Sequence, residues 1–418
     1  MKKVLYIDYT FPPLASDFRA AALARFLPEF GWQPIIVSAS ELVSYDKDYN
    51  LLQQVPSETQ VHRVWHKEPS SRVWRYLLDT LKVHIDFPDS FRSWYAPALG
   101  KATEIMRKEK IDLIHSASPP FTTALVAMKL KKEFGIPWVA DFQDGWAVND
   151  FLDAYYSETL LKPLYQFQKL RARKGEGDIL RSAAKVLTAS WHVRERLFEL
   201  HRDEEKRAGI SEIEVVNLGY DEYVFERLGA RPLYPDKLTI VFLGSFYTPF
   251  KEPVIKFVRT VHDINGDAEV VFIGRGAAAT QAVTKAEATY ILNLPRKKAL
   301  AFALGSDFLF VVMPHYAKWI PAKVYEYLRL GKPILALAPE DGDLARIVRE
   351  ARGGFVLSYE PEEMKRQLKS IFEEWKQGKF KAFHPDWDYV AQFERKKLVQ
   401  RMAAIFDEVV AQISSENS

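Results

Sequence analysis

Residues 319–336 read WIPAKVYEYLRLGKPILA, and this stretch combines a helix with the strand that follows it. Pro321 suits the first turn of a helix, because its missing N–H would have no partner within the helix. Gly331 is a typical helix end, and Pro333–Leu337 has the continuous apolar character of a buried strand. A helix that leads directly into such a strand predicts an α/β protein with a parallel sheet.

The alternation of strands and helices continues from this segment toward both ends of the chain. In the second half it begins with a predicted strand at Leu238–Leu243 and ends with a helix at Pro361–Gly378. In the first half it runs from a strand at Val4–Asp8 to a strand at Glu214–Val216. Such alternation is typical of parallel sheets with helices on both faces. The predicted fold class is therefore α/β, with two Rossmann-like domains.

Glycine and proline residues mark the join between the two halves. Residues 218–237 lack sustained periodicity and form the predicted interdomain linker. We predict an N-terminal domain over residues 1–217 and a C-terminal domain over residues 238–385. Residues 386–418 are expected to form a C-terminal helix that crosses back and packs on the first domain.

Composition excludes several classes of function. The formal net charge is +3, which is too close to neutral to indicate a nucleic-acid partner. Cysteine is absent, so the chain has no disulfide, thiolate nucleophile or cysteine-based zinc site. The histidines lack the spacing of a metal site, and the chain contains neither a P-loop nor a Gly-x-Ser-x-Gly elbow.

Hydropathy predicts a cytoplasmic protein. No stretch approaches the roughly 18 apolar residues of a membrane span, and Asp8 and Pro12–Pro13 interrupt the apolar run that a signal peptide needs. Residues 66–82, 101–110 and 161–173 mix Arg and Lys with aromatic or aliphatic residues, which would allow peripheral contact with the inner face of the membrane. Solvated helix faces explain these segments equally well.

The helix that begins near Pro321 carries the most informative charged residues. The free N–H groups of a first turn and the positive end of the helix dipole form an anion site. Lys323 lies in the same turn and could add a full charge against a diphosphate. Glu326 lies one turn deeper on nearly the same face, where a carboxylate suits the hydroxyls of a ribose. An ordinary surface Lys–Glu pair is the alternative interpretation.

This segment resembles the donor-binding helix of family 4 glycosyltransferases. Further stretches are similar to motifs of that family and occur in the same order along the chain. They are Tyr9–Pro13 with Arg19, Ile111–Ser116, Gly135–Trp146, Asn217–Asp221, Leu243–Ser245 and Phe272–Gly274. The resemblance implies the GT-B fold, in which two facing Rossmann-like domains bind the acceptor mainly through the first domain and the nucleotide-sugar mainly through the second.

The resemblance also implies the reaction. A retaining glycosyltransferase moves a sugar from a nucleoside diphosphate-sugar to an acceptor hydroxyl, here in polysaccharide or glycolipid biosynthesis. The implied partners are the nucleotide-sugar donor and a glycan or lipid-linked acceptor, with no nucleic acid. No cofactor is expected besides the donor substrate. No Asp-x-Asp pair is present to hold a metal between phosphates, so a metal-independent enzyme is expected.

Individual roles follow from the matched motifs. Lys251 matches the lysine that stabilises the leaving group, and Glu326 matches the second glutamate of the Glu-x7-Glu motif, which is tied to ribose. Lys251, Asp144 and Glu326 are the catalytic candidates. The predicted donor-binding residues are Gly244, Ser245, Lys251, Gly274, Arg275, Lys323, Val324, Tyr325 and Glu326.

Three departures from the family pattern leave other functions open. Lys318 replaces the first glutamate of the motif, Ser245 replaces a basic residue, and residues 15–17 (Ala-Ser-Asp) replace paired glycines. The donor sugar is therefore not identified. A nucleotide-sugar epimerase of the same fold and a catalytically inactive protein that binds a glycan or partner are the alternatives.

The first domain offers a smaller set of candidates. Asp141 and Asp144 lie on and just after a predicted buried strand, where a carboxylate could orient the acceptor or the donor sugar. A helix cap or a loop salt bridge is the alternative for both. His115 ends another predicted strand and could serve the site or be a satisfied structural residue.

Overall fold

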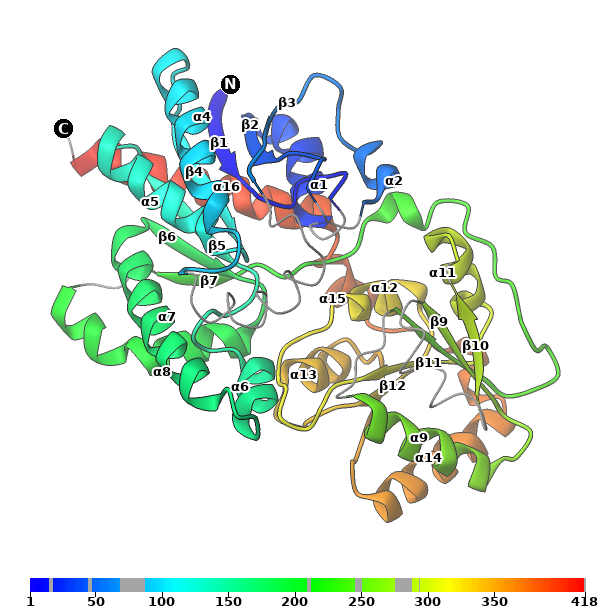
Figure 1. Cartoon of the computed structure of the whole chain (residues 1–418). Coiled ribbons are helices and arrows are strands. Elements are labelled where there is room, and N and C mark those ends of the chain that lie inside the picture. Colours follow the sequence, from blue (N-terminus) through cyan, green and yellow to red (C-terminus); the bar gives the residue numbers. More distant parts are fainter. Residues whose placement is uncertain are drawn as a thin grey trace. The chain divides into compact units, whose positions relative to one another are not determined.

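The computed structural model describes residues 1–14, 18–43, 47–67, 87–208, 212–244, 250–274, 288–292 and 294–416. The chain divides into two compact units. The first consists of Met1–Leu218 together with Arg395–Ser418, and the second of Gly219–Glu394. Figure 1 shows both units as α/β folds with helices packed beside the strands. Each unit is described by itself below.

The first unit is built on a seven-stranded parallel sheet. Its strand order is β3-β2-β1-β4-β5-β6-β7, so the order reverses between β1 and β4. The strands are β1 (Lys2–Ile7), β2 (Trp32–Ala39), β3 (Gln60–Val64), β4 (Leu113–Ser118), β5 (Trp138–Phe142), β6 (Lys185–Thr188) and β7 (Ile213–Val215). Its helices are α1 (Phe18–Phe26), α2 (Tyr49–Leu52), α4 (Tyr95–Lys108), α5 (Thr122–Phe134), α6 (Asp150–Ser157), α7 (Lys162–Ser182), α8 (Trp191–Ala208) and α16 (Arg395–Glu416), with 3-10 turns at Leu27–Phe30 and Arg92–Trp94.

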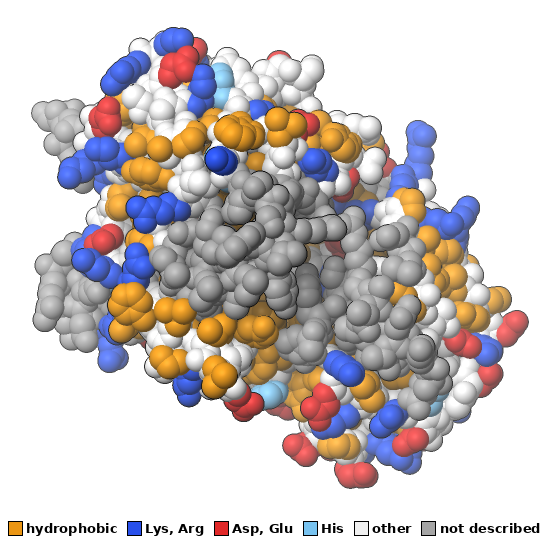
Figure 2. All heavy atoms as spheres, in the orientation of Figure 1, with side chains coloured by type: hydrophobic (Ala, Val, Ile, Leu, Met, Phe, Trp, Pro, Cys, Tyr) orange, Lys and Arg blue, Asp and Glu red, His pale blue; other side chains and the backbone are white. Residues whose placement is uncertain are grey.

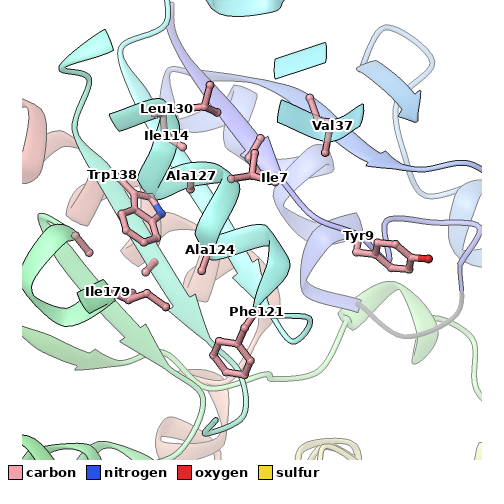
Figure 3. Packing of buried hydrophobic residues seen from close by; sticks show 14 of the residues in the cluster. Ile7, Tyr9, Val37, Ile114, Phe121, Ala124, Ala127, Leu130, Trp138 and Ile179 are labelled. Carbon is pink, nitrogen blue, oxygen red and sulfur yellow. The ribbon is translucent and has the colours of Figure 1, made fainter. Parts of the chain in front are cut away.

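Small side chains let α5 lie close to this sheet. Figure 3 shows Ala124 and Ala127 on α5 near Ile7 and Ile114 of the strands. All four side chains are buried in one hydrophobic cluster. The close approach of the helix to the sheet fixes the position of the residues at the start of α5, which contribute to the site described below.

The C-terminal helix packs on the first unit, as predicted. Phe406 of α16 packs edge-on against Trp32, with ring centroids 5.5 Å apart, and Asp407 accepts a hydrogen bond from the Trp32 indole. Lys2 and Asp407 form an ion pair of 2.6 Å. The single helix expected within residues 386–418 is instead two helices, α15 (Trp387–Ala391) and α16, and α15 belongs to the second unit.

The second unit has a six-stranded parallel sheet with the order β10-β9-β8-β11-β12-β13. The strands are β8 (Thr239–Leu243), β9 (Glu269–Gly274), β10 (Thr289–Leu292), β11 (Phe308–Val312), β12 (Ile334–Leu337) and β13 (Gly354–Leu357). Its helices are α9 (Lys251–Ile264), α11 (Arg296–Leu304), α12 (Lys323–Leu330), α13 (Asp343–Glu350), α14 (Pro361–Lys376) and α15, with 3-10 turns at Glu222–Val224 and Lys379–Ala382. This doubly wound order reverses between β8 and β11, and ligands of such sheets bind at the carboxyl ends of the strands beside the reversal.

Most predicted elements are present, and the differences have local causes. Helical spacing in the sequence predicts one long helix from Ser157 to about Ser182, but α7 begins at Lys162. A separate helix, α6, precedes it, because Asn149 caps a helix start by accepting a hydrogen bond from the Leu152 N–H. The sequence also predicts a helix around Ala277–Ala286, and this segment lies outside the described residues. The predicted linker, residues 218–237, falls almost entirely within the range of the second unit.

Candidate functional site

Two glycine turns touch at the carboxyl ends of β8 and β9. Gly244 has a φ of 114°, a conformation that side chains other than glycine rarely adopt, and its N–H donates to the Ile273 carbonyl at 2.8 Å. A Cβ placed on Gly274 would lie only 2.1 Å from the Gly244 oxygen. Both glycines are therefore required for the close approach of these turns, which lie beside the reversal of strand order.

The side chain of Lys323 reaches this pair of turns. Its Nζ lies 3.7 Å from the centroid of the Phe242 ring, and a Cβ on Gly244 would be only 2.9 Å from that nitrogen. Although Lys323 is only half-buried, desolvation by the surrounding atoms lowers its pKa to about 7. Within the described part of the chain no carboxylate pairs with it. An ammonium held over a glycine turn in this way is suited to bind an anion.

Helix α12 begins at Lys323 and adds backbone donors to the same place. No side chain caps its first turn, so the helix offers N–H groups and its positive dipole end there. Tyr327 fixes the helix against the strand, since its hydroxyl oxygen accepts a 2.7 Å hydrogen bond from the Leu243 N–H. Tyr290 similarly donates to the Gly274 carbonyl at 3.0 Å. The helix and both glycine turns are thus held together by buried and half-buried tyrosines.

Glu326 lies one turn further along α12, as the helical spacing predicts. Its side chain is 13% exposed and forms an ion pair with Arg296 at the start of α11. Val324 and Tyr325 are buried, with the Tyr325 ring packed 5.1 Å from that of Phe393. A ligand at this helix could therefore meet these two residues only through the backbone.

Three other donor residues are predicted for this site. Lys251 is the first residue of α9 and is exposed, and none of its interactions joins it to the Gly244 turn or Lys323 within the described residues. Ser245 and Arg275 lie outside the described residues.

Lys318, which stands in the place of the first motif glutamate, is bound to an acidic neighbour. Its Nζ lies 2.5 Å from a carboxylate oxygen of Asp341. Its carbonyl accepts a 2.8 Å hydrogen bond from the N–H of Asp343, the first residue of α13. The lysine therefore belongs to a structured turn.

In the first unit, Asp144 lies on the loop that follows β5. Its side chain is exposed at a cavity in this unit, and desolvation by the atoms around it raises its pKa. The loop is held by Glu176, a fully buried residue of α7, whose Oε1 accepts the N–H groups of Trp146 and Ala147 at 2.8 and 2.7 Å. His201 of α8 contacts the other carboxylate oxygen at 3.3 Å.

Sequence reasoning missed Glu176, although a signal for it exists. The chain reads Gly175-Glu176-Gly177 in the middle of a helix, where two glycines are costly. Gly175 is required because a Cβ there would lie 2.5 Å from the Trp146 ring. An acidic residue between helix glycines can thus indicate a helix that side chains of another segment approach closely.

Two first-domain candidates are structural residues. Asp141 is fully buried and receives two hydrogen bonds from Arg19, at 2.6 and 2.5 Å. His115 is buried between the Tyr6 ring, stacked at 4.9 Å, and Phe406 at 5.2 Å. The alternative interpretation, a salt bridge or a satisfied core histidine, therefore applies to each.

The described residues form neither a metal-binding cluster nor a membrane-spanning helix. No group of three or more histidine and carboxylate side chains could hold a metal ion there. No helix in that part of the chain is both long enough and apolar enough to cross a membrane.

The first unit matches a known family. Residues 17–211 match the family model described as "Glycosyl transferase 4-like domain". Among curated proteins, none matches the chain in sequence.

Solved structures of GT-B proteins share the fold over nearly the whole chain. Anabaena Alr3699/HepE, solved with UDP and glucose, is 14% identical, with a TM-score of 0.64 and coverage of 97% of this chain and 100% of its own. The α,α-trehalose 6-phosphate synthase of Burkholderia multivorans is 10% identical, with a TM-score of 0.65 and coverage of 100% and 99%. A trehalose-6-phosphate protein of E. coli, bound with UDP-2-fluoro glucose, is 9% identical, with a TM-score of 0.60 and coverage of 99% and 98%.

These findings confirm the predicted fold class, two Rossmann-like domains of the GT-B glycosyltransferase fold. Within that class, residues 17–211 of the chain resemble the glycosyltransferase 4-like domain.

Proposed function

We propose that the protein is a retaining glycosyltransferase that moves a sugar from a nucleoside diphosphate-sugar to an acceptor hydroxyl in polysaccharide or glycolipid assembly. The observation that supports this most is the Lys323 ammonium over the Gly244 turn, at the reversal of strand order and beside the first turn of α12, which no side chain caps. A diphosphate is the anion that this arrangement fits, since it accepts bonds from several donors at once. Neighbours of the same fold were solved with UDP or a UDP-sugar.

In this proposal the leaving diphosphate is stabilised by fixed charges. Lys323 and the positive end of the α12 dipole, near Val324 and Tyr325, offset the charge that develops as the glycosidic bond breaks. Lys251 is proposed as a second cation, and Glu326 as the ribose ligand beside Arg296. With charge supplied by lysines and helix amides, the reaction needs no divalent metal. Asp144 is proposed to orient the acceptor or donor sugar.

Nucleotide binding provides the first test. We expect UDP, GDP or dTDP to bind the wild-type protein in calorimetry. Lys323→Ala should weaken binding about 10- to 100-fold, which corresponds to the loss of one charge-assisted contact. Lys256→Ala, which removes an exposed lysine of α9 that pairs with Glu252, is the matched control and should change nothing. If none of the three nucleotides binds, the proposal is wrong.

Product stereochemistry tests the reaction itself. With a nucleotide-sugar that binds and an accepted acceptor, proton NMR of the first turnovers should show the anomeric configuration of the donor kept in the product. An inverted product would refute retention while leaving glycosyl transfer in place.

One observation favours a second candidate, a catalytically inactive protein that binds a glycan or a partner. Lys318 replaces a motif glutamate and is already bound to Asp341. In that case the protein would bind a nucleotide yet neither transfer nor hydrolyse any donor sugar. A nucleotide-sugar epimerase would instead convert a UDP-sugar without an acceptor, and NMR of the donor alone would reveal it.

Membrane proximity is also part of the proposal, because it would give access to a lipid-linked acceptor. Figure 2 shows hydrophobic side chains gathered on the surface over α6 and α7. The exposed residues there are Tyr155, Leu160, Phe167 and Leu170. Lysines and arginines occur on α7, so the part of this surface over α7 suits anionic lipid. Co-sedimentation with vesicles that contain phosphatidylglycerol, compared with phosphatidylcholine alone, would test it.

A further inference from the structure

A cavity of about 250 Å³ opens in the first unit beside Asp144. It lies between residues 87–91, the start of α5, the loop at 144–149 and one face of α7. Its walls are mainly apolar and are dominated by aromatic rings. The rings belong to Phe87, Phe91, Phe121, Trp146 and Tyr165.

The aromatic wall is held in a fixed arrangement. Trp146 stacks on Phe121, with ring centroids 4.6 Å apart and planes 12° apart, and on Phe87 at 5.2 Å and 27°. The edge of the indole fits against the bare backbone of Gly175 on α7. Glu176 holds the Trp146 N–H. Because the rings are locked before any ligand arrives, binding a planar group here costs little side-chain ordering.

Most polar groups at the cavity are already used within the protein. Asp89 accepts hydrogen bonds from the N–H and hydroxyl of Thr122, at 2.9 and 2.7 Å. Lys169 is paired with Asp153 at 2.6 Å, and the Arg171 guanidinium lies 4.6 Å from the centroid of Phe87. Asp144 differs, because it makes no hydrogen bond or ion pair with any described residue. The cavity thus combines an apolar interior with one carboxylate, that of Asp144, which no described residue pairs with.

We propose that this cavity binds the aglycone of the acceptor, and that the aglycone is a planar aromatic ring system whose hydroxyl, or whose attached sugar hydroxyl, lies near Asp144. The near-parallel rings of Phe121, Trp146 and Phe87 favour a planar group, since such a group can stack on them or meet their edges. The volume is sufficient, because an apolar cavity of about 150 Å³ already holds benzene. The role of the hydroxyl depends on the proposed glycosyl transfer, whereas the binding of the ring does not.

The experiment uses the full chain and 4-methylumbelliferone, a planar phenol, as the probe. We expect saturable binding, followed by probe fluorescence and by quenching of tryptophan emission. Gln168→Trp should fill the cavity from its half-buried position on α7 and weaken binding at least tenfold. Gln166→Trp places the same ring on an exposed position of the same helix and should leave binding unchanged.

Two further measurements make the result decisive. Ala172→Phe, a second filling variant at a buried lining position, should act like Gln168→Trp, and circular dichroism must show both variants folded. Farnesol, an aliphatic alcohol, should bind more weakly than the phenol. Failure of the probe to bind, equal binding by folded Gln168→Trp and wild type, or tighter binding of farnesol would each overturn the proposal.

The result is separable from the test of the overall function. UDP affinity is measured on the same variants and should not change in Gln168→Trp. Probe binding without nucleotide binding would refute the transferase while the cavity stands as an aromatic-binding site. Nucleotide binding without probe binding would refute the aglycone site alone.

Discussion

At the scale of single residues, the buried pair of Arg19 and Asp141 shows what sequence can and cannot predict. Motif resemblance includes Arg19, and the pattern places Asp141 at the end of a strand, but the two are far apart in the chain. Their contact depends on how α1 packs beside β5, which no local pattern encodes. The same holds for Glu326. Helical spacing predicts which face of α12 it occupies, but it does not predict that Arg296 is its ion-pair partner.

Removing Arg19 should destabilise the first unit strongly. Arg19→Ala leaves the carboxylate of Asp141 buried without its partner, so we expect the free energy of unfolding to fall by about 3–5 kcal/mol in urea titration. Arg107→Ala, at an exposed arginine on α4, should cost less than about 0.5 kcal/mol. Equal and small losses in both variants would show that the buried pair is not required.

Lys323 should make nucleotide binding depend on pH. Its pKa of about 7 means that the free protein loses the ammonium charge as pH rises through 7. A diphosphate binds the charged form, so binding raises the pKa and takes up a proton. We expect UDP affinity to fall as pH rises from 7 to 9 in calorimetry. Lys323→Arg keeps its charge over this range and should show a smaller fall. A profile that is the same in both proteins would contradict this assignment.

At the scale of elements, helices α7 and α8 fix the loop after β5 through a buried network. Sequence periodicity predicts helices here and a loop with Asp144. Periodicity does not predict that the carboxylate of Glu176, in the middle of α7, accepts hydrogen bonds from two N–H groups of that loop. The break between α15 and α16 is a similar case. Its cause is tertiary, since the Phe393 carbonyl accepts the Tyr220 N–H at 2.9 Å and the Phe393 ring packs on Tyr325.

Substitutions at Glu176 should separate loop positioning from general stability. Glu176→Ala leaves the N–H groups of Trp146 and Ala147 buried without an acceptor, which costs about 1–3 kcal/mol for each group. Glu176→Gln keeps a carbonyl acceptor and should cost less. Hydrogen exchange at these two amides should accelerate most in the alanine variant. Asp178→Ala, at a half-exposed position of the same helix, is the control and should leave both amides protected.

At the scale of the whole molecule, the alternation of strands and helices is sufficient to predict two parallel α/β units, because hydrophobic period and turn residues are local properties. The membership of α16 in the first unit is also confirmed. The extent of each unit depends on long-range contacts. The first unit is made of two separate parts of the chain, Met1–Leu218 and Arg395–Ser418.

Removing the C-terminal residues 395–418 should therefore destabilise the first unit, although most of that unit lies in the N-terminal part of the chain. Deleting residues 395–418 removes the apolar side chains that α16 packs against the sheet and α1, among them Met402, Phe406 and Val409. Each contributes about 1.5–3 kcal/mol, and a typical domain has only about 5–15 kcal/mol in total. We expect the fragment 1–218 to lack cooperative thermal unfolding, and a synthetic 395–418 peptide to restore it. Cooperative unfolding of the fragment alone would refute this dependence.

The two places where the polypeptide passes from one unit to the other are neighbours. Tyr220 forms a bridge with Glu394 inside the second unit, and the Arg395 side chain donates to the Leu218 carbonyl inside the first. Gly219–Glu394 is therefore an insertion in the sequence of the first unit, and the two ends of the insertion lie next to each other. The first unit is completed by α16, which follows the insertion. Such an insert is exchangeable in principle: a nucleotide-binding half from another enzyme could be spliced between Leu218 and Arg395 without cutting either sheet.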